Sequence, residues 1–251
     1  MAEELVHDDE TLEDLQLGGL QLIQKKNGFR FGMDSVLLAH FAYIKAQDTV
    51  ADFGTGSGVL PLLLIGRNKG KTFRCFEIQE ELAEMAGRTM ILNGLENRVK
   101  IIHGDAANAE QWIASCSLDA VICNPPYSIP GKSISSPMET RAISRSQRKD
   151  TLKGFFKSAF RVLKGRGSLF LVYPAPQMLE AMKQLQEAHL EPKRFQLVYP
   201  YEDKPANLVL IEAVKDAKPM LHPMDPLIIY EKNRDLTNRL KSVYHINQNP
   251  V

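Results

Sequence analysis

A short apolar segment followed at once by closely spaced glycines is the stretch that most constrains the fold. Thr49–Phe53 is typical of a buried strand, Gly54-Thr55-Gly56-Ser57-Gly58 follows it, and Val59–Ile65 is apolar throughout. Strand, glycine loop and helix in this order let the backbone approach a nucleotide-like ligand closely, because glycine has no Cβ. Val59 stands where a NAD- or FAD-binding loop needs its third glycine, and no P-loop Gly-Lys-Ser/Thr follows. Asp52, just before the loop, would repel a pyrophosphate and suits a ligand with a positively charged or amino-acid moiety.

The rest of the chain alternates strand and helix patterns. After Thr49–Phe53, the predicted strands are 72–77, 99–103, 118–123, 168–173, 194–200 and 207–214, and the predicted helices between them are 80–92, 149–163 and 176–189. This alternation predicts a parallel sheet with right-handed crossovers, and the short connection between the last two strands predicts an antiparallel pair at one side. A final helix is expected near 236–243.

Polar side chains stand where the early strands end, and ligands of open α/β sheets bind at this edge. Glu77 ends the second strand, about 20 residues past the glycine loop, where such an acid accepts hydrogen bonds from ribose hydroxyls. Asp105 follows the third strand and Asn124 follows the fourth. The sequence therefore predicts a ligand crevice along the carboxyl ends of these strands.

Asn124-Pro125-Pro126-Tyr127 forces a turn at the end of the fourth strand, because two successive prolines remove two backbone donors and fix φ. Such a turn can aim the Asn124 amide oxygen and the Pro125 carbonyl at one point, with the ring of Tyr127 beside them. Two convergent acceptors suit a substrate NH2 group, because they localise the nitrogen lone pair more in the transition state than in the ground state. The alternative is an ordinary loop that contains two prolines.

The segment before the glycine loop is expected to be an N-terminal extension, residues 1–45, packed on a main domain of residues 46–251. Within it, the pattern of Leu20–Gln24, a turn at Lys25–Gly28 and Phe29–Phe31 predicts a hairpin or two short strands. Asp34 or Ser35 is expected to cap a helix that runs to Ala42.

Composition narrows the possible environments. No apolar run approaches the ~20 residues that span a membrane, and residues 1–14 carry seven acids and no Lys or Arg, unlike a secretion signal. We therefore expect a cytoplasmic protein without a membrane contact. Cys75, Cys116 and Cys123 lack metal-ligand spacing, so reduced thiols and no metal are expected.

The net charge is only +1, so any contact with nucleic acid must be local. Between Arg141 and Arg166 there are nine Lys or Arg residues and one acid, Asp150. This run is either an RNA-binding surface, with Arg141, Arg145, Arg148 and Lys149 nearest the predicted site, or the solvated face of a helix.

Three groups of residues together resemble known proteins. Asp52, Gly54, Gly56 and Gly58 resemble the first motif of S-adenosylmethionine (SAM) dependent methyltransferases, and Asn124 to Tyr127 resembles the motif of enzymes that methylate exocyclic or amide nitrogens. Phe29–Ala39 and the segment from Pro226 to Tyr244 are similar to the bacterial tRNA-valine adenine N6-methyltransferase family. The chain departs from that family at Ser146-Gln147, where a His-Glu pair is expected.

The resemblance implies a Rossmann-like class I methyltransferase of the α/β class, with a mostly parallel seven-stranded sheet, helices on both faces and an antiparallel pair at one side. It implies SAM as cofactor and methyl transfer to the N6 amine of an adenosine in tRNA, beside the anticodon, by a protein expected to be a monomer. Asn124, Pro125 and Tyr127 would act on the amine. The implied cofactor contacts are Asp52, Gly54, Gly56, Gly58, Glu77, Asp105, Ala106 and Asn124. Two alternatives remain open here: N5-glutamine methylation of a release factor, and a SAM-binding RNA module without activity.

Overall fold

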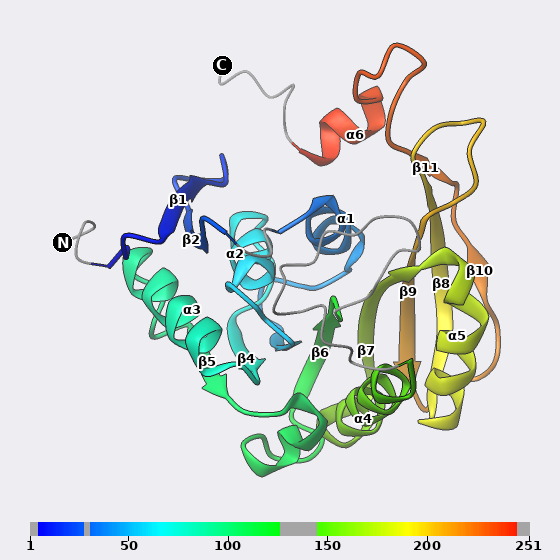
Figure 1. Cartoon of the computed structure of the whole chain (residues 1–251). Helices are drawn as coiled ribbons and strands as arrows, with labels where there is room; N and C mark the ends of the chain where they lie inside the picture. The colour runs from blue at the N-terminus through cyan, green and yellow to red at the C-terminus, as the bar shows by residue number, and fades with distance from the viewer. Residues whose placement is uncertain (1–4, 28–30, 126–144, 245–251) are drawn as a thin grey trace.

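The computed structural model describes residues 5–27, 31–125 and 145–244. Its main sheet has the order β10-β8-β9-β7-β6-β3-β4-β5, and β11 pairs with β8 (Figure 1). The strands are β3 Thr49–Phe53, β4 Thr72–Glu77, β5 Val99–His103, β6 Leu118–Cys123, β7 Leu163–Pro174, β8 Leu190–Tyr199, β9 Leu208–Lys215, β10 His222–Pro223 and β11 Leu227–Ile228. Among the described residues the sheet has nine strands where seven were predicted: β3 to β9 correspond to the prediction, and β10 and β11, with two residues each, are additional.

The strand directions confirm the mostly parallel sheet. β5, β4, β3, β6 and β7 pair with one another in parallel, in that order, whereas β9 is antiparallel to both β7 and β8. Phe53 of β3 pairs with Phe76 of β4 on one side and with Cys123 of β6 on the other. The residues that follow these three therefore leave the sheet at the same edge.

Helices cover both faces of the sheet, as predicted (Figure 1). One hydrophobic core holds buried residues of α1 Met33–Phe41, α2 Val59–Gly66 and α6 Asn238–Val243, and Met90 of α3 Glu80–Leu92. The other core holds residues of η1 Ala106–Gln111, α4 Arg145–Val162 and α5 Met178–Glu187, which follows the short η2 Ala175–Gln177. β3 shows the strand periodicity behind this arrangement, because Val50 belongs to the first core and Ala51 and Phe53 belong to the second.

The N-terminal hairpin differs from the prediction. β2 Gln21–Lys25 pairs with the preceding β1 Glu10–Asp14, a strand that was not predicted, and the predicted partner segment Phe29–Phe31 lies largely outside the described residues. The acidic composition of β1 hid this strand, but its carboxylates have partners: Glu10 is 2.7 Å from Arg88 of α3, and Lys25 is 2.8 Å from Asp9. Acidic residues have low strand propensity, and these ion pairs stabilise them in a way that a propensity scale does not include.

α1 begins one residue earlier than its predicted cap. Gly32 is the N-cap residue, and Asp34 and Ser35 lie in the first turn, where Asp34 Oδ1 accepts the Ser35 N–H at 2.9 Å. At the other end, Lys69 Nζ donates to the carbonyl oxygens of Ala39, His40 and Ala42 at 2.8, 3.1 and 2.6 Å. These bonds satisfy carbonyls that have no partner within the helix.

β7 begins earlier than predicted. α4 ends at Val162, and β7 starts directly at Leu163, whereas the sequence predicted a strand only from residue 168. Buried Lys215 explains the sharp change, because its Nζ donates to the carbonyl oxygens of Phe160 and Leu163 at 2.7 and 2.8 Å. Among the described residues, no helix is both long enough and apolar enough to cross a membrane.

Candidate active site at the carboxyl ends of the parallel strands

The glycine loop connects β3 to α2 with left-handed backbone at all three glycines. The φ angles of Gly54, Gly56 and Gly58 are +80°, +56° and +83°. An ideal Cβ on Gly58 would lie 2.7 Å from Met90 Cε, whereas one on Gly56 would meet nothing within 4 Å. Gly58 therefore permits close packing of α3, and Gly56 leaves backbone open on the side where a ligand could approach.

Asp52 is completely buried below the glycine loop. Its Oδ2 accepts the Thr55 hydroxyl hydrogen at 2.6 Å, and its Oδ1 has no hydrogen-bond partner within the described part of the chain. Burial raises the pKa of Asp52 to about 7, and the negative charge of Glu77 adds to the increase. A positively charged ligand group would relieve both effects.

Glu77 joins the end of β4 to the same loop. Its Oε2 accepts the N–H of Gly56 at 2.9 Å, and its Oε1 accepts the N–H of Gln79 at 3.0 Å. Both oxygens keep lone pairs for further donors, because each carboxylate oxygen accepts about two hydrogen bonds. Ile78 beside it is 65% exposed and offers apolar surface, a feature that the sequence reasoning did not identify.

Asp105 and Ala106 lie one strand further along the edge. Glu77 pairs with His103 across β4 and β5, so Asp105 leaves the sheet beside Glu77. Asp105 Oδ1 accepts the Ala107 N–H at 2.9 Å and caps η1, and Ala106 is buried. The capping role leaves the other oxygen of Asp105 available to a ligand.

Asn124 directly follows β6 and is half-buried, and Pro125 is buried beside it. Because Phe53 pairs with Cys123, Asn124 and Gly54 are neighbouring positions at the edge of two adjacent strands. The amide nitrogen of Asn124 donates to Ser35 Oγ at 3.0 Å. The sequence reasoning considered Ser35 only as a helix cap, and no local pattern could have revealed its contact with Asn124.

Several predicted substrate residues cannot be placed. Tyr127 and Arg141 lie outside the described residues, and for Arg145, Arg148 and Lys149 only the α4 backbone is described. β6 and β7 are parallel, so α4, which connects them, begins near the edge of the sheet that carries the site. These three positions therefore lie at the end of α4 that is nearer the site. From the middle of α4 to the start of β7, three basic residues have acidic partners: Lys153 is 3.7 Å from Glu187, Arg161 pairs with Glu110, and Lys164 is 2.7 Å from Asp119.

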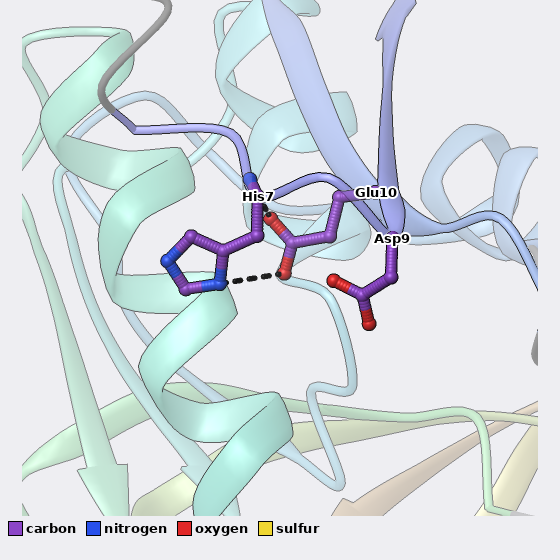
Figure 2. Close-up of side chains that lie close together, drawn as sticks. All are labelled: His7, Asp9 and Glu10. Atoms are coloured by element: carbon purple, nitrogen blue, oxygen red, sulfur yellow. Dashed lines mark hydrogen bonds and ion pairs between the residues drawn. The ribbon is translucent and has the colours of Figure 1, made fainter.

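One group of side chains elsewhere has ligand atoms close enough together for a metal ion. His7, Asp9 and Glu10 each offer an atom within 4.8 Å of the others (Figure 2). Glu10 is nevertheless bound to a cation, because its two oxygens accept from Arg88 at 2.7 Å each, and Lys25 Nζ is 3.5 Å away. A metal ion here would face two positive charges, so we assign the group to the ion pairs that hold the hairpin on α3.

Comparison with solved structures identifies the class of fold. The chain aligns with a predicted O-methyltransferase from Agrobacterium tumefaciens with a TM-score of 0.66 and 21% identity, over 85% of this chain and 96% of that one. It also aligns with the T. thermophilus 16S rRNA N2 G1207 methyltransferase, solved with AdoMet and guanosine, with a TM-score of 0.58 and 19% identity, over 82% and 50% of the two chains. The fold is the Rossmann-like fold of SAM-dependent methyltransferases, as predicted.

Sequence comparison then gives the family. Residues 32–196 match the model of the methyltransferase small domain, and the chain belongs to this family. Two relatives are named tRNA1(Val) (adenine(37)-N6)-methyltransferase. The one from Aliivibrio salmonicida is 28% identical over 209 residues, which are 82% of this chain and 85% of the relative. The one from a Flavobacteriaceae bacterium is 26% identical over 153 residues, and the match spans 61% of this chain and 63% of that relative.

Proposed function

We propose that the protein transfers a methyl group from SAM to the exocyclic N6 amine of an adenosine in tRNA, at a position beside the anticodon. The observation that carries this proposal is the pairing of Phe53 with Cys123, which makes Asn124 the neighbour of Gly54. An acceptor for an amine thus lies next to a loop with open backbone. The names of the relatives support adenine in tRNA as the substrate.

The residues present fit SAM. The cofactor carries a positive sulfonium and an amino-acid end, and Asp52 is a buried carboxyl group with an unpartnered oxygen and a raised pKa. Glu77 would accept hydrogen bonds from the ribose hydroxyls, with Gly54, Gly56 and Gly58 giving the loop its shape. Asp105, the Ala106 N–H and the exposed face of Ile78 would hold the adenine. When bound, SAM supplies the methyl group.

Asn124 and Pro125 would act on the amine by accepting its two hydrogens. An exocyclic amine is a weak nucleophile because its lone pair is delocalised into the ring, and two acceptors favour the geometry in which the lone pair is localised. No side chain has to remove a proton before transfer, because the amine nitrogen becomes strongly acidic once it is methylated. Catalysis therefore rests on position and on hydrogen-bond acceptors.

Tyr127 would stack on the target base, a contact worth roughly 1–3 kcal/mol. An anticodon-loop base is already unpaired, so the cost of exposing it is small. Arg141, Arg145, Arg148 and Lys149 would contact the RNA backbone, whereas the ion pairs of Lys153, Arg161 and Lys164 argue against a contact along the whole of α4.

A tRNA substrate is consistent with a location in the cytoplasm, which forms part of the proposal. The division into an extension of residues 1–45 and a domain of residues 46–251 stays part of the proposal.

The direct test is mass spectrometry of tRNA nucleosides from cells with and without the protein, with N6-methyladenosine as the readout. In vitro, purified protein, labelled SAM and bulk tRNA give the matching measurement. Label in RNA from the wild type and none from Asn124→Ala is the expected result. Label in a protein fraction would identify amide methylation instead, and SAM binding without any transfer would identify an inactive module.

A further inference from the structure

A serine from the first turn of α1 contacts the amide of Asn124. Asn124 Nδ2 donates to Ser35 Oγ at 3.0 Å, and Ser35 is 3% exposed. The two residues are 89 positions apart, and they meet because α1 packs on the same face of the sheet as α2. Because Ser35 is buried and Asn124 is half-buried, water can replace this hydrogen bond only in part when one partner is removed.

The chemistry of an asparagine amide gives this contact its importance. The two ends of the amide have nearly the same shape, but one is an acceptor and the other is a double donor. Only the oxygen can accept a hydrogen from a substrate amine. In the reversed orientation, the NH2 group of Asn124 would face another NH2 group, and the interaction would be repulsive.

We propose that Ser35 is a positioning residue for methyl transfer, because it binds the amide nitrogen of Asn124 and thereby presents Oδ1 to the substrate amine. This inference rests on the proposed function of Asn124. Ser35 itself does not touch the reacting atoms. Its hydrogen bond holds Nδ2 toward α1 before the substrate arrives, which leaves Oδ1 for the substrate amine.

The surroundings of Ser35 make it a rigid support. Its N–H donates to Asp34 Oδ1 at 2.9 Å, and Val36, Leu37 and Leu38 beside it are buried in the core. Lys69 holds the other end of the helix through three carbonyl oxygens. α1 also contacts β7 and β9, so the serine hydroxyl is carried by an element that is held at several points.

Ser35→Ala tests the inference in steady-state assays with tRNA. Loss of one net hydrogen bond corresponds to about a tenfold decrease in kcat. The dissociation constant of SAM, measured by calorimetry, should stay within about twofold, because the hydrogen bond of Ser35 goes to Asn124 and not to the glycine loop, Glu77 or Asp105, which would hold most of the cofactor. Ser35→Cys keeps the shape of the side chain with a larger atom that is a weaker hydrogen-bond acceptor, so it should also lower kcat, and it replaces Ser35→Ala if that variant folds poorly.

A matched control is Ser168→Ala, which lies away from the site edge. It removes the hydrogen bond of 3.2 Å that the Ser168 hydroxyl donates to Glu212. Its kcat should equal that of the wild type. If Ser35→Ala and Ser35→Cys lower kcat no more than Ser168→Ala does, the positioning role is wrong. A fall in SAM affinity equal to the fall in kcat would also contradict it.

The amide itself provides a readout that is independent of turnover. In a 15N-labelled sample, the side-chain NH2 signals of Asn124 are those absent from Asn124→Asp, and they should shift in Ser35→Ala and not in Ser168→Ala. An unchanged signal in Ser35→Ala overturns the contact. Absence of methyl transfer by the wild type would instead overturn the proposed function, and the two failures are therefore distinguishable.

Discussion

The hydroxyl of Thr55 donates to the Asp52 carboxylate at 2.6 Å, inside the turn that begins the glycine loop. This bond favours the ionised carboxylate but does not fully offset its burial, which raises the pKa of Asp52 to about 7. The group is thus close to half ionised at neutral pH without a ligand. A cation bound nearby would shift it to the charged form.

We expect the affinity for SAM to increase with pH around neutrality. Below the raised pKa the carboxyl group must lose its proton when the cationic cofactor binds, so affinity should fall by up to about tenfold per pH unit on the acidic side. Calorimetry between pH 6 and pH 8 measures this change. Asp52→Asn should bind more weakly at pH 8 and lose the part of the pH dependence that Asp52 contributes.

Asp119→Asn is the control for that titration. Asp119 contacts Thr49 and Lys164 at the opposite edge of β6, and its pKa is lowered, so it stays ionised throughout this range. This variant should keep the pH profile of the wild type. A wild-type profile identical to that of Asp52→Asn would contradict the proposed role of Asp52.

The same titration affects the stability of the ligand-free protein. Because the folded-state pKa of Asp52 lies above its ordinary value of 3.8, the native state binds more protons between these two pH values. The contribution of Asp52 to stability therefore decreases as pH rises from about 4 to about 7. Urea unfolding should show that Asp52→Asn is more stable than the wild type at pH 8, and a lower stability would argue against a buried, strained carboxylate.

Asn124→Ala should abolish methyl transfer while the dissociation constant of SAM changes little. The substitution removes the amide acceptor at the end of β6 and leaves the glycine loop and Glu77 intact. Single-turnover assays with labelled SAM and tRNA measure the first effect, and calorimetry measures the second. Turnover that persists in this variant would be incompatible with an acceptor role for the amide.

Gly58→Ala should destabilise the protein and weaken SAM binding. The left-handed φ of +83° costs roughly 1–2 kcal/mol for a residue with a Cβ, and the new methyl group would push the end of Met90 aside. Gly87→Ala on α3 is the matched control, because its Cβ would meet nothing within 4 Å. In an α-helix this change should stabilise the protein by about 0.5–1 kcal/mol, and urea unfolding distinguishes the two signs.

Arg88→Met should destabilise the protein by up to about 3–5 kcal/mol, because it removes two hydrogen bonds from the buried carboxylate of Glu10 and leaves Lys25, 3.5 Å away, as its remaining basic partner. Adding Glu10→Gln should restore part of the loss, so the double variant should be more stable than the sum of the single changes predicts. Urea unfolding at pH 7 measures all three variants. Strict additivity would mean that the two side chains do not stabilise each other.

This ion pair also predicts a response to acid. The hydrogen bonds from Arg88 lower the pKa of Glu10 to about 2, so its stabilising contribution is complete above the ordinary value of 4.5 and is lost as pH falls from there toward 2. Thermal unfolding between pH 5 and pH 3 should show a smaller decrease for Glu10→Gln than for the wild type. Equal slopes would contradict this assignment.

The sequence predicted the parallel strands and the glycine loop because each carries its own local signal. Thr49–Phe53 is apolar and short, and Gly54 to Gly58 need left-handed backbone that glycine alone adopts easily. β1 was not predicted, because its acidic residues are stabilised by Arg88, which lies on another element and leaves no trace in the local pattern.

The same distinction applies to the candidate site. Asn124 was identified from its strand and its prolines, but the contact with Ser35 depends on how α1 is packed. The link from Glu77 to Gly56 joins two elements whose residues were predicted separately. Local patterns identify the side chains that can react, whereas their mutual orientation comes from tertiary contacts between distant segments.

The position of α1 in the fold has a consequence for biosynthesis. α1 leaves the ribosome before any strand of the main sheet, but it packs on β7 and β9, and the last residue of β9 is Lys215. α1 also packs on α2 and is held by Lys69, both nearby in the sequence, but its docking is complete only when the distant contacts with β7 and β9 have formed. A nascent chain that already contains the glycine loop and Asn124 can therefore form the SAM-binding loop before Ser35 is in place to bind the Asn124 amide. We expect the growing polypeptide to acquire binding before turnover, with competence for transfer appearing only after β9 has been synthesised.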